Sequence, residues 1–255
     1  MTRSSSICLC LALALALIAP GTALAGDPTV VLRPMKDNTL YEDAKGGLSN
    51  GSGDHLFAGR LINMNQRLRR AVLAFDFSVD IPPGSAIQSV TLQMNMSRSI
   101  AGETPVALHR LNADWGEALS DAPGQEGGGA SALDGDATWI NTFFDTQNWA
   151  TAGGDFRPVA SATTPVDGPG LYTWASTPEL VADVQAWVDA PTINFGWIVL
   201  GDESAAPPTA KRFDSRENAV PANRPTLTVI FSDADQIFRS DFESGNTMEW
   251  TSTQP

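Results

Sequence analysis

Only two histidines are available for acid–base or nucleophilic chemistry in this chain of 255 residues. His55 follows Asp54 in a glycine-rich stretch, and His109 stands beside Arg110 in a segment that alternates like a strand. A catalytic triad needs a histidine that is oriented by a carboxylate next to a nucleophile. We expect both histidines to be packed or surface side chains, and no catalytic residue is predicted. Zinc is not expected, because a His-x-x-x-His pair is absent.

Acidic side chains in two predicted loops have the oxygen chemistry that calcium prefers. Asp114 and Glu117 flank one segment, and Asp134 and Asp136 flank another. Calcium takes six to eight oxygen ligands from carboxylates, carbonyls and water. Neither segment continues as an EF-hand, which would need further ligands downstream. The sequence therefore requires no cofactor and leaves a structural calcium ion open, with solvated surface acids as the alternative.

Aromatic rings and arginine side chains suggest a carbohydrate site. Trp139 and Trp149 lie in an irregular region, and flat aromatic faces can stack on sugar rings. Arginine makes bidentate contacts to carboxylated sugars. The candidate arginines are Arg69, Arg70, Arg212 and Arg216. The alternatives are burial of both tryptophans in the core and pairing of the arginines with nearby acids.

The elements that would position these side chains follow an N-terminal leader. Residues 1–25 resemble a secretory signal peptide, with Arg3 before an apolar run over residues 7–18 and cleavage between Ala25 and Gly26. Both cysteines of the chain lie inside this leader. The mature protein would therefore form no disulfide. No later apolar run is long enough to cross a bilayer, so no transmembrane segment is expected.

The mature chain is predicted to consist of one domain over residues 26–232 and a tail over residues 233–255. The tail looks like a short C-terminal motif that is common on exported Gram-negative proteins and serves for sorting or attachment, with a disordered end as the alternative. We therefore expect a secreted protein, extracellular or on the surface of a Gram-negative bacterium, with the periplasm as the alternative location.

The charge balance excludes some partners. The chain has 16 basic and 29 acidic residues, which gives a formal net charge of −13. Such a surface repels nucleic acid and anionic lipid. The hydrophobic content of 42% is ordinary for a globular protein, so the chain can form a core.

Short alternating segments indicate an all-β fold. Residues 89–97 alternate polar and apolar side chains, which predicts a strand with one buried face. Residues 69–77 form a second strand, with Leu73 and Phe75 on one face and Val72 on the other. Further strands are predicted at residues 29–33, 39–42, 56–61, 106–111, 195–200, 211–215 and 226–231. Many short strands separated by turn residues are typical of an antiparallel β-sandwich or jelly roll.

Two further segments complete the prediction. Thr177 and Pro178 are suited to begin a helix, and apolar residues follow at helical spacing until Pro191. Residues 119–170 show no regular pattern but carry several large aromatic residues. We expect one short helix and a long irregular insertion packed on the sandwich, with a helical turn near residues 139–144.

The mature chain resembles the DNRLRE-domain proteins, which are secreted bacterial β-sandwich domains related to carbohydrate-binding module family 96 of alginate-degrading enzymes. The matching blocks are DNTLY at 37–41, NG at 50–51, LFAG at 56–59, RAVLAFD at 70–76, IPPGSAI at 81–87, DWGE at 114–117, GDATW at 135–139, GGDF at 153–156, NFGW at 194–197, FDSRE at 213–217 and RPTL at 224–227. The resemblance covers roughly residues 28–232. It implies a jelly-roll fold, export and a non-catalytic role, and it transfers no specific ligand.

These features together favour a secreted, non-catalytic module that binds a polysaccharide or a cell-surface glycan. A structural or adhesive surface protein with a protein partner is the first alternative, and the tail favours it. A polysaccharide hydrolase or lyase is the second alternative.

Overall fold

A computed structural model describes residues 27–62, 67–204 and 206–232. The expected signal peptide, its cleavage point at Ala25–Gly26 and the C-terminal tail at 233–255 lie outside the described residues.

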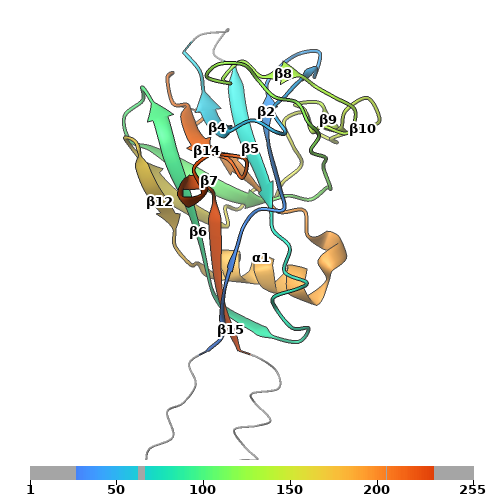
Figure 1. Cartoon of the computed structure of the whole chain (residues 1–255), viewed down its shortest axis with the longest axis vertical. Coiled ribbons are helices and arrows are strands. Elements are labelled where there is room, and N and C mark those ends of the chain that lie inside the picture. Colours follow the sequence, from blue (N-terminus) through green and yellow to red (C-terminus); the bar gives the residue numbers. More distant parts are fainter. Residues whose placement is uncertain (1–26, 63–66, 205, 233–255) are drawn as a thin grey trace, which may run out of the picture.

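The described chain is built from antiparallel strands and one α-helix (Figure 1). The strands are β1 (Thr29–Leu32), β2 (Lys36–Tyr41), β3 (Leu48–Ser49), β4 (His55–Arg60), β5 (Leu68–Ala74), β6 (Ala86–Ser99), β7 (Thr104–Arg110), β8 (Ala130–Ser131), β9 (Asn141–Phe143), β10 (Gln147–Asn148), β11 (Ala162–Val166), β12 (Gly170–Trp174), β13 (Trp197–Leu200), β14 (Lys211–Asp214) and β15 (Thr226–Ser232). The helices are α1 (Pro178–Asp189) and the short 3₁₀ turns η2 (Pro191–Ile193) and η3 (Pro221–Asn223).

One large sheet curls over to form both layers of a sandwich. Its strand order is β1-β15-β6-β14-β4-β5-β13-β7-β11, with β12 also paired to β6 and β2 also paired to β5. β4 joins the two layers, because Leu56 pairs with Phe213 of β14 while Gly59 pairs with Arg69 of β5. The expected all-β fold, an antiparallel sandwich with one α-helix, is therefore confirmed for the described residues.

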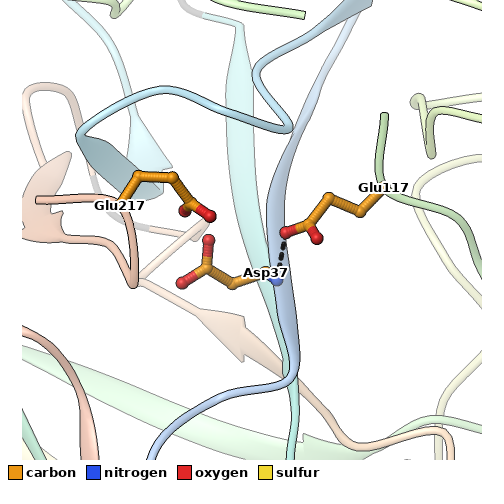
Figure 2. Close-up of side chains that lie close together, drawn as sticks. All are labelled: Asp37, Glu117 and Glu217. Atoms are coloured by element: carbon orange, nitrogen blue, oxygen red, sulfur yellow. Dashed lines mark hydrogen bonds between the residues drawn. The ribbon is translucent and has the colours of Figure 1, made fainter. Parts of the chain in front are cut away.

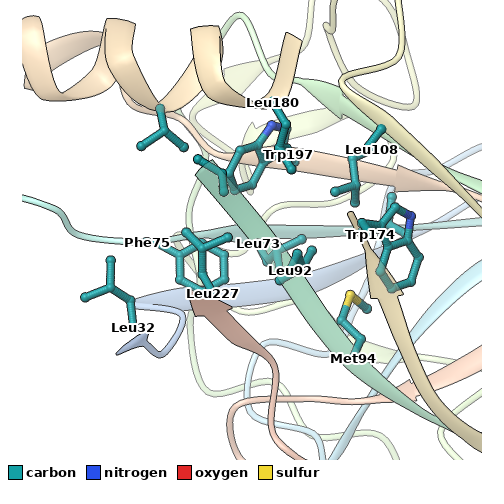
Figure 3. Close-up of a cluster of buried hydrophobic side chains, with 14 of the residues drawn as sticks. Leu32, Leu73, Phe75, Leu92, Met94, Leu108, Trp174, Leu180, Trp197 and Leu227 are labelled. Carbon is teal, nitrogen blue, oxygen red and sulfur yellow. The ribbon is translucent and has the colours of Figure 1, made fainter. Parts of the chain in front are cut away.

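The main core fills the space between the two layers. On β6, the apolar residues Val90, Leu92, Met94 and Met96 are fully buried while their neighbours are half-exposed, as the alternation predicted. These side chains face Leu73 of β5 and other core residues across the sandwich (Figure 3). The burial of this face stabilises the native state, because apolar area is removed from water.

Helix α1 packs against the sandwich and contacts β6. It begins where the sequence predicted, since the Thr177 hydroxyl accepts a hydrogen bond from the Leu180 amide at 3.0 Å and Pro178 occupies the first turn. Leu180, Val184 and Trp187 are buried against the main core. The predicted helix is therefore confirmed, including its cap.

A second, smaller core lies on the other face of β2, β5 and β13. Val72 and Ala74 of β5, Leu40 of β2 and Ile198 of β13 pack there against Trp115 and other residues from the long connections. β5 is therefore buried on both faces, as its apolar pattern indicated. The two cores explain why the irregular connections are ordered, because they cover an apolar sheet face.

Two predictions for the insertion are wrong. Residues 162–166 form β11, which pairs with β7, within the segment where no strand was expected, and β12 follows at 170–174. Residues 141–148 form the hairpin β9–β10 rather than a helical turn. Asp145 at its tip has a φ of 60°, which suits a tight turn. Within the part of the chain that the structure describes, no helix is both long and apolar enough to cross a membrane.

Candidate functional site

Trp139 and Arg70, both predicted to contact a carbohydrate, lie together and are both half-buried, with Trp139 packed against the second core. Trp139 stands between β8 and β9, and Arg70 belongs to β5. The guanidinium carbon of Arg70 is 4.8 Å from the centroid of the Trp139 ring. Its Nε and Nη2 atoms each lie 2.8 Å from a carboxylate oxygen of Glu203, and Nη1 donates to the Gly153 carbonyl at 2.7 Å. The bidentate pair and the cation–π contact restrict the orientation of the indole.

Two adjoining depressions surround this pair, and Ala152 lines both. The one beside Trp139 has a volume of about 490 Å³, and the one beside Arg70 has a volume of about 350 Å³. Further residues at the first depression are Glu42, Asp43, Arg60, Arg67 and Ile140. Further residues at the second are Asn112, Thr151, Gly154, Asp155 and Phe156. The surface therefore combines aromatic rings, arginines and fixed hydrogen-bond acceptors.

The carboxylates at the larger depression are tied to their own chain. An oxygen of Glu42 accepts a hydrogen bond from the Leu68 amide at 2.6 Å. Asp43 forms an ion pair with Arg67 at 3.3 Å. Such carboxylates are held as acceptors in one orientation, which suits recognition of hydroxyl groups.

Trp149 and Arg69 do not belong to this surface. Trp149 is 5% exposed, packs in the second core and donates its indole N–H to the Thr138 carbonyl at 2.9 Å. Arg69 is 1% exposed, and its guanidinium carbon lies 4.7 Å from the centroid of the Tyr41 ring. Burial lowers the pKa of Arg69 to about 10. Both residues hold the fold together from inside.

The two remaining predicted arginines lie elsewhere. Arg212 of β14 donates to Ser97 and Gln125 and lines a separate depression of about 230 Å³. Arg216 follows β14 and pairs with Glu117 at 2.7 Å and Glu217 at 2.8 Å. The structure therefore brings only Arg70 of the four arginines to Trp139.

The four acids that were considered for calcium do not meet at one point. Asp114 pairs with Lys36 at 2.8 Å, and Asp134 is exposed. Asp136 is fully buried, and its two carboxylate oxygens accept hydrogen bonds from the Ala118 and Leu133 amides. Asp136 thus holds a loop, while Glu117 belongs to a different acidic group.

That acidic group consists of Asp37, Glu117 and Glu217 (Figure 2). Asp37 belongs to β2, Glu117 lies in the connection after β7, and Glu217 follows β14. One oxygen from each carboxylate lies within 4.8 Å of the other two. Asp37 is fully buried and the two glutamates are half-buried, so three segments that are distant in the sequence bring their carboxyl groups to one place.

The electrostatics of this acidic group oppose ionisation. Burial, followed by repulsion from Glu217, raises the pKa of Asp37 well above its usual value. Burial raises the pKa of Glu217 to about 7, with repulsion from Glu117 adding to the effect and Arg216 opposing it. Burial also raises the pKa of Glu117. A group of carboxylates with raised pKa values marks a place where charge is poorly compensated.

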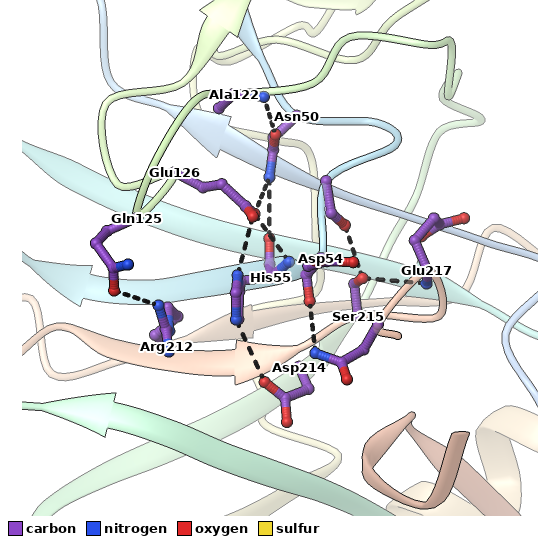
Figure 4. Close-up of polar contacts among 12 residues, drawn as sticks. Asn50, Asp54, His55, Ala122, Gln125, Glu126, Arg212, Asp214, Ser215 and Glu217 are labelled. Atoms are coloured by element: carbon purple, nitrogen blue, oxygen red, sulfur yellow. Dashed lines mark hydrogen bonds and ion pairs between the residues drawn. The ribbon is translucent and has the colours of Figure 1, made fainter. Parts of the chain in front are cut away.

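His55 lies at the centre of a second polar group (Figure 4). Its Nδ1 atom is 3.0 Å from Glu126, and its Nε2 atom is 3.6 Å from Asp214. Glu126 also accepts hydrogen bonds from the His55 and Asn50 nitrogens. Burial would raise the pKa of Glu126, but these hydrogen bonds outweigh it and lower the pKa below its usual value. His55 is half-buried and packed, as the sequence predicted, while His109 contacts the Phe156 ring.

Ser49 lies in a sequence pattern that is typical of a catalytic serine, but its position in the fold does not suit a nucleophile. Residues 47–51 match Gly-x-Ser-x-Gly, which in hydrolases places a serine on a strand-to-helix turn. Ser49 instead ends the two-residue strand β3 and is fully buried. Its hydroxyl oxygen lies 3.0 Å from the Ala137 carbonyl and bonds to Asn38. Ser49 is therefore a structural residue.

Asp37 and Glu217 were missing from the predicted ligands. The available signal was the run of polar residues at 36–39 directly before Leu40. These residues belong to a strand, and Asp37 is buried there although it carries a carboxyl group.

Comparisons with known proteins assign no family. No family model matches the chain, and no curated protein matches it. Among solved structures, the chain is similar to the subviral particle of infectious bursal disease virus VP2 at a TM-score of 0.16 and 11% identity. The match covers 79% of this chain and 61% of that chain. A likeness at this level carries no argument, so the functional conclusion rests on the geometry of the residues.

Proposed function

We propose that this protein is an exported, non-catalytic domain that binds a polysaccharide or a surface glycan beside Trp139. The observation that carries the proposal is the Arg70 side chain, which is fixed by Glu203 and Gly153 and lies against the indole. A ring that is already oriented in the free protein loses little entropy when a sugar stacks on it.

The surrounding groups support a polymer of sugars as the ligand. The depressions beside Trp139 and Arg70 adjoin through Ala152, so together they can accept more than one sugar ring. Arg60 and Arg67 line the larger depression beside Glu42 and Asp43, so the surface offers both hydrogen-bond donors and acceptors to sugar hydroxyl groups.

A binding role also fits the acids at the site. Glu42 and Asp43 are engaged by the Leu68 amide and the Arg67 side chain. A general acid or base must instead be free to exchange a proton with the substrate. Export is proposed on the leader sequence, and a location outside the cell or in the periplasm would give access to such polymers.

The test is affinity electrophoresis of the mature protein in gels that contain acidic or neutral polysaccharides. Trp139→Ala is expected to lose most of the retardation, since an aromatic stacking contact contributes about 0.5–1.5 kcal/mol in addition to the apolar area that it buries. Leu171→Ala is the matched control, because Leu171 is an exposed apolar residue of β12. Equal retardation of wild type and Trp139→Ala would refute the site.

Two further outcomes concern the nature of the activity. Release of new reducing ends from the retained polymer would refute the non-catalytic role. Absence of retardation by every polymer would refute glycan binding and favour the adhesive alternative with a protein partner.

A further inference from the structure

The acidic group of Asp37, Glu117 and Glu217 contains buried oxygens that lack any donor. Oδ1 of Asp37 and Oε2 of Glu217 are buried without a hydrogen-bond partner among the described residues. Asp37 itself is fully buried, and its carboxylate points toward that of Glu217 (Figure 2). Two carboxylates that face each other without a donor are costly in the interior. Their arrangement requires either a shared proton or a cation between them.

The protein cations near this group do not neutralise it. Arg216 donates to both carboxylate oxygens of Glu117, at 3.1 and 2.7 Å, and its Nε atom lies 2.8 Å from Oε1 of Glu217. Its backbone amide donates to Oδ2 of Asp37 at 2.8 Å, so Oδ1 of Asp37 and Oε2 of Glu217 receive nothing from it. Lys36 is engaged by Asp114 at 2.8 Å. Three ionised carboxylates against the Arg216 guanidinium leave two negative charges, which is the charge that one divalent cation compensates.

One cation can contact all three carboxylates, because one oxygen from each residue lies within 4.8 Å of the other two. Oxygens on opposite sides of calcium are up to about 5.2 Å apart, since each bond is about 2.3–2.6 Å long. Calcium also accepts irregular sets of carboxylates, whereas magnesium demands near-ideal octahedral geometry and usually keeps several waters. An all-oxygen donor set suits a hard cation.

We propose that Asp37, Glu117 and Glu217 bind a calcium ion, with water completing its coordination. The ion would join β2, the connection after β7 and the segment after β14, which are brought together only by the tertiary fold. Its role is therefore structural, and it is independent of the polysaccharide site. The acids Asp114, Asp134 and Asp136 take no part in it.

The test compares thermal unfolding of chelator-treated mature protein with and without excess calcium at neutral pH. Calcium at about 100 times its dissociation constant is expected to raise the midpoint by roughly 5–10 °C. Asp37→Asn should abolish this shift, because it removes one ligand charge while preserving shape. Asp134→Asn is the matched control, since it makes the same change at an exposed acid. Titration calorimetry of the wild type should show one calcium ion per chain.

The competing arrangement is a proton shared by Asp37 and Glu217. It predicts that calcium does not raise the midpoint of the wild type. This result overturns the calcium site, as does an equal calcium shift in wild type and Asp37→Asn. A midpoint raised equally by magnesium overturns the assignment to calcium. If Asp37→Asn does not fold, Glu217→Gln gives the same readout at a less buried position.

Discussion

The carboxylate of Asp183 accepts a hydrogen bond from the indole nitrogen of Trp197 at 3.0 Å, deep between helix α1 and the sheet. The same carboxylate oxygen accepts from the Ser161 hydroxyl at 2.5 Å. The other oxygen lies 3.6 Å from Arg110. A single acid therefore connects α1 to β13, to the residue before β11 and to β7.

Replacement of Asp183 by alanine is expected to destabilise the protein by about 3–5 kcal/mol, because it leaves Arg110 and the Trp197 N–H buried without a partner. Urea denaturation followed by tryptophan fluorescence measures this loss. Asp189→Ala on the same helix is the control, since Asp189 is exposed and should change stability by less than about 1 kcal/mol. Equal losses in the two variants would contradict the role of Asp183.

Gly153 is expected to be essential for the position of Trp139. Its φ is +92°, and an added Cβ would lie 2.6 Å from Nη1 of Arg70 and 2.8 Å from the Trp139 ring. Gly153→Ala should therefore destabilise the protein by about 1–3 kcal/mol and weaken polysaccharide retardation. Gly168→Ala is the control, because nothing lies within 4 Å of the added Cβ. If polysaccharide retards Gly153→Ala as strongly as the wild type, the position of the Trp139 indole does not depend on Gly153.

Glu203 is predicted to act on binding through Arg70. Glu203→Ala removes both carboxylate contacts to the guanidinium, which then has more freedom beside Trp139. We expect several-fold weaker polysaccharide binding with a stability change of about 1 kcal/mol or less. Glu103→Ala removes an exposed acid elsewhere and should leave binding unchanged. An unchanged dissociation constant for Glu203→Ala would contradict this positioning role.

The acidic group gives the stability a specific dependence on pH. Asp37 and Glu217 have folded-state pKa values above their usual 3.8 and 4.5, and that of Glu217 is about 7. Between the unfolded and folded pKa values, the native state binds more protons than the unfolded state. In calcium-free buffer, the contribution of this group to stability should therefore fall as pH rises from about 4.5 to 7.

Urea midpoints measured across this pH range provide the test. Asp37→Asn should flatten the decline, because it removes one of the two coupled carboxyls. Glu126 acts in the opposite direction and at lower pH, since its pKa is lowered and its contribution is lost as pH falls through that value. A decline that is equally steep in wild type and Asp37→Asn would contradict the assignment to Asp37 and Glu217.

Strands and helices could be predicted from the sequence where alternating apolar residues or capping residues mark them directly. The alternation over residues 89–97 predicted the buried face of β6, and Thr177 with Pro178 predicted the start of α1. β11 was missed because it is short and carries Pro165, which disfavours a strand reading. Periodicity identifies the faces of a strand but does not identify its neighbours.

The candidate sites depend on those neighbours. Arg70 and Trp139 are far apart in the sequence, as are Asp37 and Glu217, and they meet only through sheet pairing and loop packing. The residue types of Trp139, Arg70 and Glu117 were recognisable, whereas their partners Glu203, Asp37 and Glu217 were not. Only three-dimensional proximity distinguishes them from other acids of an acidic chain.

The pairing of β1 with β15 has a mechanical consequence. Thr29 lies opposite Ile230 in an antiparallel register, so the described chain enters and leaves the sandwich at the same end (Figure 1). A force that pulls the N-terminal end of β1 away from the C-terminal end of β15 would break the hydrogen bonds between these strands one after another, instead of loading all of them together. The domain should therefore unfold at a low force when it is pulled through both of these ends.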